Sequence, residues 1–328
     1  MQAIRRFLSK LAANTPGAKR DRRIEEKLAK LDARLKDRLD AVDLRLTKIA
    51  RALKDDRQWR ALAKSKLDAL LREQYFAEIL PEEYPFSLMA RRFNLNSQNE
   101  EDGMTLALLK ECGSPTHSFV EIGSGTNGGN CGFLAEEFGW RGLMVERHPE
   151  RARKCGERFG DPGRVTCLCS AATPENINTL LIENGLTGEV DLFSLDIDSF
   201  DYWVFEAMTA CSPRIVILEY NGYFGPEIPV TIPSDVSLDD APEGYHGASL
   251  AAFVQLAEKK GYRLLACDIT GTNAFFARND LRPDLPAVTP AQAYRRKRDR
   301  YDPYGVASRR TIDVIAEAEK RGLPLHYL

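Results

Sequence analysis

SFVEIGSGTNGGNCGFLAEEFGWRGLMVER, residues 118–147, is the stretch of this sequence that decides the fold. The apolar run Ser118–Ile122 predicts a β-strand, and a glycine-rich turn follows it. A helix-like stretch then leads to a second apolar run, which ends at Glu146. Glycines allow the chain to turn sharply out of a strand and to approach a ligand where a Cβ atom would clash. An acidic residue at the end of the second strand can accept hydrogen bonds from both hydroxyls of a ribose. The pattern therefore predicts a nucleoside-containing cofactor at the carboxyl edge of a parallel sheet.

Glu121 distinguishes between two kinds of cofactor. The glycines at residues 123, 125 and 128 fit the G-x-G-x-x-G spacing of dinucleotide folds, in which a helix N-terminus faces a pyrophosphate. A carboxylate at residue 121 would repel a pyrophosphate, whereas it would attract an amino group on the ligand. A strand-turn-helix with purely structural glycines is the simpler alternative.

The opening E-x-G-x-G, followed by an acidic strand end at Glu146, resembles class I S-adenosylmethionine (SAM)-dependent methyltransferases. The resemblance implies that the methionine part of SAM lies over the glycine turn and that Glu146 holds the ribose. It also implies that the turn after the third strand, which contains Ser170, contacts the adenine. The cofactor-binding residues expected on this basis are Glu121, Gly123, Ser124, Gly125, Glu146, Ser170, Ala171 and Asp196.

The segments after Ser97 alternate between strand-like and helix-like patterns. Strands are predicted at Ser118–Ile122, Gly142–Glu146, Arg164–Cys169, Val190–Asp196, Arg214–Tyr220, Tyr262–Cys267 and Asn273–Arg278. Strands that alternate with helices indicate right-handed crossovers and a parallel sheet. Only five residues, Asp268–Thr272, separate the last two strands, so these two form an antiparallel hairpin. The predicted fold is α/β: a doubly wound, mostly parallel seven-stranded sheet with an antiparallel C-terminal hairpin, similar to the class I methyltransferase fold and unlike the dinucleotide fold.

Four regions are predicted along the chain. A basic segment, residues 1–19, precedes a long helix at residues 20–80, and the methyltransferase domain, residues 81–282, is followed by a C-terminal helical extension, residues 283–328. Apolar side chains recur in the long helix at intervals of three and four residues, at Ile24, Leu28, Leu31, Leu35, Leu39, Val42, Leu46, Ile49 and Leu53. This heptad pattern, with one stutter, predicts a coiled coil through which the protein self-associates. A helix that folds back onto the catalytic domain near Trp59 is the alternative.

Composition limits the remaining possibilities. The chain has 328 residues, of which 43% are hydrophobic, and its 46 basic and 48 acidic residues give a formal charge of -2, so no global field indicates a nucleic-acid partner. The seven cysteines form no C-x-x-C pair, which favours reduced thiols and a cytoplasmic location. No apolar run reaches membrane-spanning length.

Acidic residues follow the fourth and fifth predicted strands. Side chains alternate between the faces of a strand, so Asp196 and Asp198 share one side of strand four, and Glu219 and Asn221 share one side of strand five. Oxygen ligands suit Mg²⁺, and the arrangement is similar to that of catechol-type O-methyltransferases, which implies a metal site at Asp198, Glu219 and Asn221. The rival prediction, which we favour, is metal-free, with Asp198 or His246 as the general base. A third hypothesis is that Asp196 and Asp198 only cap the next helix and orient the SAM amino group.

Two later segments complete the prediction. Residues 225–247, rich in Pro, Asp and Gly, are placed to cover the site as a lid, with His246 at their far end. The basic run at residues 295–298 is expected to be a solvated helix face.

The function predicted from these features is SAM-dependent O-methylation of a small-molecule or carbohydrate acceptor. Together with residues 97–103 and 245–250, the acidic strand ends resemble a bacterial branch loosely akin to the FkbM-type O-methyltransferases. The alternatives are a non-catalytic coiled-coil scaffold with a methyltransferase-like domain and a nicotinamide-dependent oxidoreductase.

Overall fold

The computed structural model describes Lys36 and residues 86–297 and 313–328. The predicted basic segment and coiled coil, and with them the predicted self-association, lie outside the described residues apart from Lys36. The chain divides into two units, residues 1–63 and 64–328, and the fold described below belongs to the second unit.

Seven strands form the central sheet. Their bounds are β1 (Ser118–Ile122), β2 (Arg141–Glu146), β3 (Val165–Cys169), β4 (Gly188–Leu195), β5 (Cys211–Glu219), β7 (Tyr262–Cys267) and β8 (Asn273–Arg278). The strand order is β3-β2-β1-β4-β5-β8-β7, and only β8 runs antiparallel to its neighbours β5 and β7. This order confirms the predicted α/β fold: a mostly parallel seven-stranded sheet whose C-terminal hairpin supplies the antiparallel strand, as in methyltransferase-like folds. The direction of winding reverses between β1 and β4, which is where open α/β sheets bind ligands.

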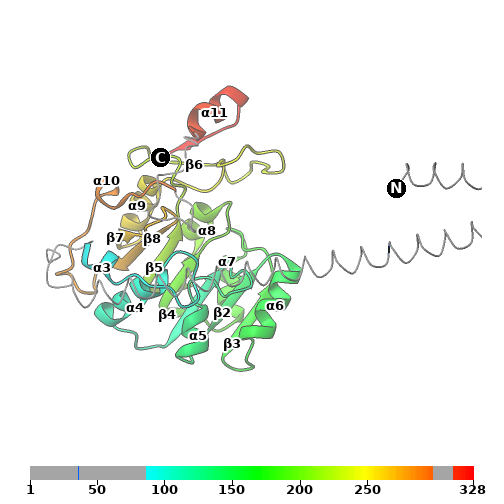
Figure 1. The fold of residues 1–328 in the computed structure, drawn as a ribbon, viewed down its shortest axis with the longest axis vertical. Coiled ribbons are helices and arrows are strands. Elements are labelled where there is room, and N and C mark those ends of the chain that lie inside the picture. The colour runs from blue at the N-terminus through cyan, green and yellow to red at the C-terminus, as the bar shows by residue number, and fades with distance from the viewer. Residues whose placement is uncertain (1–35, 37–85, 298–312) are drawn as a thin grey trace, which may run out of the picture. The chain divides into compact units, whose positions relative to one another are not determined.

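Helices cover both faces of the sheet (Figure 1). The described helices are α3 (Phe86–Ala90), α4 (Glu101–Cys112), α5 (Gly132–Glu137), α6 (Pro149–Phe159), α7 (Ile177–Glu183), α8 (Asp201–Ala207), α9 (Leu250–Lys259), α10 (Pro290–Ala293) and α11 (Val314–Arg321). Apolar side chains of α4, α5 and α6 pack on one face of the sheet, and those of α7, α8 and α9 pack on the other.

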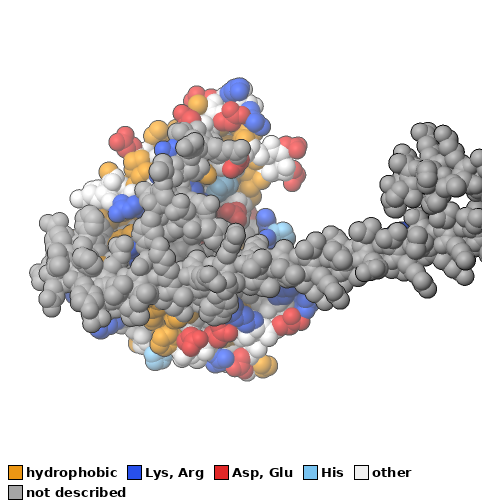
Figure 2. Space-filling model, viewed as in Figure 1, with side chains coloured by type: hydrophobic (Ala, Val, Ile, Leu, Met, Phe, Trp, Pro, Cys, Tyr) orange, Lys and Arg blue, Asp and Glu red, His pale blue; other side chains and the backbone are white. Residues whose placement is uncertain are grey.

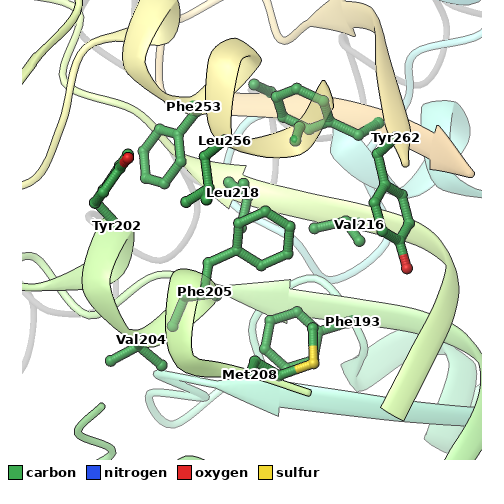
Figure 3. Close-up of a cluster of buried hydrophobic side chains, with 14 of the residues drawn as sticks. Phe193, Tyr202, Val204, Phe205, Met208, Val216, Leu218, Phe253, Leu256 and Tyr262 are labelled. Carbon is green, nitrogen blue, oxygen red and sulfur yellow. The ribbon is translucent and has the colours of Figure 1, made fainter. Parts of the chain in front are cut away.

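The core consists of two apolar layers, one on each side of the sheet, because successive strand residues point to opposite faces. In β5, Val216 and Leu218 enter one layer, whereas Ile215 and Ile217 enter the other. Figure 3 shows the first layer, in which Phe205 of α8 packs against residues of β4, β5 and α9. Burying each such side chain contributes about 1.5–3 kcal/mol to folding.

The start of α4 differs from the helix start that the sequence suggests. Residues 97–100, SQNE, fit the S-x-x-E pattern of a capping box, which predicts Ser97 as the N-cap of a helix that begins at Gln98. The helix instead begins at Glu101, and its N-cap Glu100 has φ 70° and makes no side-chain capping bond. Asp102 provides the acceptor instead, since its carboxylate accepts hydrogen bonds from the backbone N–H groups of Leu95, Asn96 and Ser97. The segment before α4 is thus a loop held by the first turn of the helix.

The C-terminal residues pack on the predicted lid. The short strand β6 (Val230–Thr231) pairs with β9 (His326–Tyr327), and Figure 1 shows both beside α11 at one end of this unit. A third apolar cluster joins Phe224, Val230, Ile232 and Tyr245 to Val314 and Ala318. The lid therefore has a small core of its own, part of which comes from α11.

The surface of the described residues carries both signs of charge. Figure 2 shows acidic and basic side chains interspersed on the face in view. None of the described helices combines the length and apolar character that crossing a bilayer requires. All seven cysteines are free thiols.

Candidate functional site

A cavity of about 610 Å³ opens where β1, β2, β4 and β5 end. Most residues that the sequence singled out line it: Glu121, Gly123, Gly125, Glu146, Ser170, Ala171, Asp196, Asp198 and Glu219. Ser124, Asn221 and His246 do not belong to its lining. The cavity therefore joins the glycine turn to the acidic ends of β4 and β5, as their positions at one edge of a parallel sheet require.

The glycines bring the backbone close to two of these residues. A Cβ atom at Gly123, which has φ 92°, would lie 1.7 Å from the carbonyl oxygen of Asp196. At Gly129 a Cβ atom would lie 2.2 Å from Oε1 of Glu121. A larger residue at position 123 would therefore separate β1 from β4, and one at position 129 would displace the Glu121 carboxyl group.

Glu121 is a fully buried carboxyl group in the cavity wall. Its Oε1 accepts a hydrogen bond from Ser194 Oγ at 3.0 Å, whereas Oε2 has no hydrogen-bond partner of good geometry. Burial raises the pKa of Glu121 to about 8, although hydrogen bonds from Cys131 and Ser194 act in the opposite direction. A buried acceptor without a partner is costly, so this oxygen fits a ligand that brings a donor.

Glu146 ends β2 and holds the glycine turn. Its Oε2 accepts a hydrogen bond from Gly125 N at 3.0 Å, and Oε1 accepts one from His148 N at 2.8 Å. The carbonyl of Glu146 accepts a hydrogen bond from Ser170 N, which places Ser170 and Ala171 beside it in the cavity wall. Each carboxylate oxygen retains a further lone pair for a ligand hydroxyl.

Ser124 faces away from this cavity. Its side chain is buried, with Oγ 3.4 Å from Cys155 Sγ on α6, and its backbone N–H donates to the carbonyl of Val145. Ser124 thus fixes the turn against α6, and the structure gives its side chain no route to a ligand.

The acidic groups after β4 and β5 form one electrostatic unit. Burial, followed by the charge of Glu219, raises the pKa of Asp196 well above its usual range, and a hydrogen bond runs from Asp196 to Glu219. Burial also acts to raise the pKa of Glu219, but Lys297 and His246 outweigh it and hold that pKa below its ordinary value. The charge of Glu219 is the largest cause that raises the pKa of Asp198. The unit therefore favours a protonated Asp196 beside an ionised Glu219.

A different acidic residue organises the turn before α8. Asp201 accepts hydrogen bonds from Ile197 N at 2.9 Å and from Ser199 N at 3.0 Å. The N-cap of α8 is Phe200, and no side chain caps this helix. The prediction that Asp196 and Asp198 cap this helix is therefore wrong, whereas the prediction that they orient the SAM amino group stays a prediction. Asp198 is exposed at the cavity with φ 55°, a left-handed conformation that Asp tolerates better than most residues.

Asp198, Glu219 and His246 come together, with their nearest ligand atoms all within 4.8 Å of one another. Asn221 does not contribute to this group, because its amide nitrogen donates to the carbonyls of Gly244 and His246, and its Oδ1 accepts from Tyr223 N. The structure thus gives Asn221 a different role from the predicted metal ligand: it holds the loop that carries His246.

Several residues of the cavity wall were not anticipated from the sequence. They are Gln98, Asn99 and Glu101 from the loop before α4 and its first turn, Thr272 and Asn273 from the β7–β8 hairpin, and Lys297, whereas Val236 and Leu238 come from the predicted lid. The Nζ atom of Lys297 lies 3.4 Å from Glu219 Oε1. Residues 295–297 are not helical, so the expectation of a solvated helix face is wrong for them. No local pattern distinguishes Lys297 from its basic neighbours, since its partner is 78 residues away.

No protein-family model matches the chain, and no curated protein matches it. Among solved structures, a SAM-dependent methyltransferase from Clostridium acetobutylicum ATCC 824 is 13% identical, and the match covers 53% of this chain and 88% of that one at a TM-score of 0.35. The methyltransferase domain of bacterial CtHen1-C is 16% identical over 55% of this chain and 97% of that one, at a TM-score of 0.37. The N-terminal domain of EvdMO1, crystallised in the presence of SAH and D-fucose, is 14% identical over 57% and 85%, at a TM-score of 0.37. These values are low, so the fold assignment rests on the strand order of the sheet itself.

Proposed function

We propose that this chain is a SAM-dependent methyltransferase that methylates an oxygen of a small, polar acceptor such as a carbohydrate. The observation that carries the proposal is a cavity in which the glycine turn, Glu121 and Glu146 face the acidic ends of β4 and β5. One part of the cavity has the groups that a nucleoside with an amino acid side arm requires, and the other has groups that can remove a proton.

The residues present fit SAM at three points. The unpartnered Oε2 of Glu121 would accept a hydrogen bond from the amino group of the methionine part. Glu146 would accept hydrogen bonds from the ribose hydroxyls, and the chain at Ser170 and Ala171 would border the adenine. When bound, SAM supplies an electrophilic methyl group on a sulfonium centre. In this proposal Asp196 supports the site through its hydrogen bond to Glu219.

Asp198 is the general base that we favour for the acceptor hydroxyl. Its carboxylate is exposed at the cavity, and the neighbouring charge of Glu219 raises its pKa, which increases its affinity for a proton. His246 lies within reach of the same carboxylate and provides an alternative base or a second step for the proton.

The predicted metal site fits less well than the metal-free arrangement. Asp198, Glu219 and His246 are a reasonable donor set for a divalent cation. However, the ammonium group of Lys297 already contacts Glu219, and the side chain of Asn221 is engaged with backbone groups. We therefore propose metal-free catalysis.

Calorimetry with SAM, SAH and NAD tests the cofactor. Saturable binding of SAM and SAH, without binding of NAD, supports the proposal, and binding of NAD alone contradicts it. A panel of sugars and small hydroxylated compounds, assayed for SAH release with and without EDTA, then tests the reaction. Turnover that EDTA leaves unchanged supports the metal-free mechanism, and loss of turnover on adding EDTA, restored by Mg²⁺, contradicts it.

Asp198→Asn separates an enzyme from a non-catalytic scaffold. In an enzyme of this mechanism the variant still binds SAM and loses turnover with the acceptor, by about 10²–10⁴-fold for a general base. A nicotinamide oxidoreductase is disfavoured because β8 runs antiparallel between β5 and β7.

A further inference from the structure

A short segment from outside the predicted methyltransferase domain crosses the end of β5. We call residues 294–297 the strap. Tyr220, directly after β5, donates a hydrogen bond from its hydroxyl to the carbonyl of Arg295 at 2.7 Å and accepts one from Arg295 N at 3.1 Å. Tyr294 donates from its hydroxyl to the carbonyl of Gly222 at 2.7 Å. Three hydrogen bonds thus fasten the strap to the chain that leaves β5.

Two glycines let the strap lie directly on the backbone beneath it. A Cβ atom at Gly271, which has φ 74°, would lie 2.3 Å from the carbonyl oxygen of Arg295. At Gly222 a Cβ atom would lie 2.9 Å from both Lys297 N and the carbonyl oxygen of Gly271. The backbone of the strap is therefore fixed on both sides up to Lys297.

The side chain of Lys297 enters the cavity among carboxylates. Its Nζ lies 3.4 Å from Oε1 of Glu219, with side-chain exposures of 26% for the lysine and 7% for the glutamate. Asp196, Asp198 and Asp268 also lie close enough to interact with the ammonium group. The other basic side chains that line the cavity in the described part of the chain, Arg147, His148 and Arg151, come instead from the residues that follow β2.

We propose that Lys297 is the fixed cation of the acceptor site and performs the electrostatic role that a divalent metal ion would have at this edge of the sheet. Its ammonium group pairs with Glu219 and lines the cavity, so its charge acts both on that carboxylate and on the space that the acceptor would occupy. A metal ion bound to Glu219 would lie beside the ammonium group and be repelled by it. The naming of this end of the cavity as the acceptor site rests on the proposed function, but the competition between Lys297 and a metal ion does not.

The consequence for chemistry concerns the acceptor oxygen. An ammonium group that the protein holds in place stabilises negative charge as it develops on a nearby oxygen, with no further reorganisation. Asp198, which faces the same space, then needs only to accept the proton. The site would thus activate a hydroxyl with groups of the chain alone.

Titration with Mn²⁺, followed by the loss of the free Mn²⁺ signal in electron paramagnetic resonance, tests the proposal without an acceptor. Lys297→Met removes the cation and leaves Asp198, Glu219 and His246 in place, so this variant should bind Mn²⁺ at least about tenfold more tightly than the unsubstituted protein. Lys297→Arg keeps the charge and should bind no more Mn²⁺ than the unsubstituted protein. The double variant Glu219→Gln, Lys297→Met should lose the binding that Lys297→Met gained.

Equal Mn²⁺ affinity in Lys297→Met and the unsubstituted protein would overturn the proposal. Saturable Mn²⁺ binding in the unsubstituted protein, abolished by Glu219→Gln, would also overturn it, and this measurement needs no Lys297 variant to fold. SAM calorimetry on the same samples separates the two proposals. If none of them binds SAM, the proposed function fails, whereas the Mn²⁺ result still decides the role of Lys297.

Discussion

At the scale of single residues, the structure buries carboxyl groups whose ionised form is unfavourable away from water. Glu121 is fully buried, and burial raises its pKa to about 8. Asp201, also buried, has its pKa raised to about 7, by burial first and then by the charge of Glu219. Asp201 is used by the turn before α8, whereas Glu121 is expected to serve a ligand or a reaction, because an apolar side chain of similar size would fold at a lower cost.

Glu121 is expected to make stability depend on pH. Because its pKa rises from 4.5 to about 8 on folding, its favourable contribution is complete below pH 4.5 and is lost as the pH rises toward 8. Glutamine does not titrate, so Glu121→Gln removes this loss. The free energy of unfolding of the variant, relative to that of the unsubstituted protein, should therefore increase with pH, by up to about 5 kcal/mol at about 1.4 kcal/mol per pKa unit. Urea unfolding at pH 5, 7 and 9 measures the difference.

The exposed Glu183→Gln on α7 serves as the control for removing one surface carboxylate. A stability difference between Glu121→Gln and the unsubstituted protein that stays constant from pH 5 to pH 9 would contradict the assignment. Glu121→Gln should also bind SAM more weakly. This result would show that the carboxyl group whose burial lowers stability at neutral pH is used to bind the cofactor.

Glu146 tests the ribose assignment. Glu146→Ala should weaken SAM binding by about 2–3 kcal/mol, as expected for the loss of charge-assisted hydrogen bonds. Part of this loss would come from the turn, because the same carboxylate holds Gly125 N and His148 N. Calorimetry gives the affinity, and a thermal melt without SAM gives the effect on the turn. Unchanged SAM affinity in a folded variant would rule out the ribose assignment.

At the scale of elements, loops that are fastened by side chains from neighbouring elements form much of the cavity wall. Asp102 on α4 holds residues 95–97, and Asn96 and Asn127 donate hydrogen bonds to each other's backbone carbonyls across to the glycine turn. Asn221 and Tyr220 hold the His246 loop and the strap in the same way. The site is therefore assembled by contacts between elements, and the strap contributes the charge of Lys297.

The strap can be loosened by removing a single hydroxyl group. Tyr220→Phe deletes both hydrogen bonds to Arg295 and should lower the free energy of unfolding by about 1–2 kcal/mol. Because Lys297 is then less firmly held, the variant should also bind more Mn²⁺ than the unsubstituted protein.

Tyr262→Phe is the matched control. Its buried hydroxyl donates to the carbonyl of Pro213 at 2.8 Å and does not contact the strap. A similar loss of stability is expected, without any gain in Mn²⁺ binding. Equal Mn²⁺ titrations for the two variants would show that Tyr220 does not hold Lys297 in place.

At the scale of the whole molecule, the sheet, its two helical layers and the lid with α11 form the described structure. The predicted coiled coil lies outside it, so self-association is a proposal from the heptad pattern alone. After the stutter, leucine at the first apolar heptad position, with β-branched residues at the second, favours three or four strands over a parallel dimer.

Deletion of residues 1–80 tests both the assembly and the independence of the domain. The shortened chain should be monomeric and should bind SAM with unchanged affinity, because the described residues that line the cavity begin at Gln98, in the loop before α4. Light scattering measures the mass of both forms. A full-length protein that is monomeric at micromolar concentration would contradict the coiled-coil prediction.

The sequence by itself determined the strands, the hairpin and the glycine turn. The signals for these features are local: apolar runs, the five-residue link at Asp268–Thr272 and the spacing of glycines. Each of them determines the backbone conformation of its own residues and their chain neighbours. Glu121 and Glu146 were also predictable as cavity residues, because the end of a parallel strand next to a turn has only one edge to face.

Only the tertiary structure decided which polar side chains meet. Asp201 holds the turn after β4, whereas Asp196 and Asp198 were the caps considered from the sequence. Asn221 binds loop carbonyls, and Lys297 reaches Glu219 from beyond the predicted domain. The direction of a side chain in a turn depends on which distant backbone groups need a partner and on where glycines permit close approach. Those conditions exist only once the sheet, the lid and the strap have packed together.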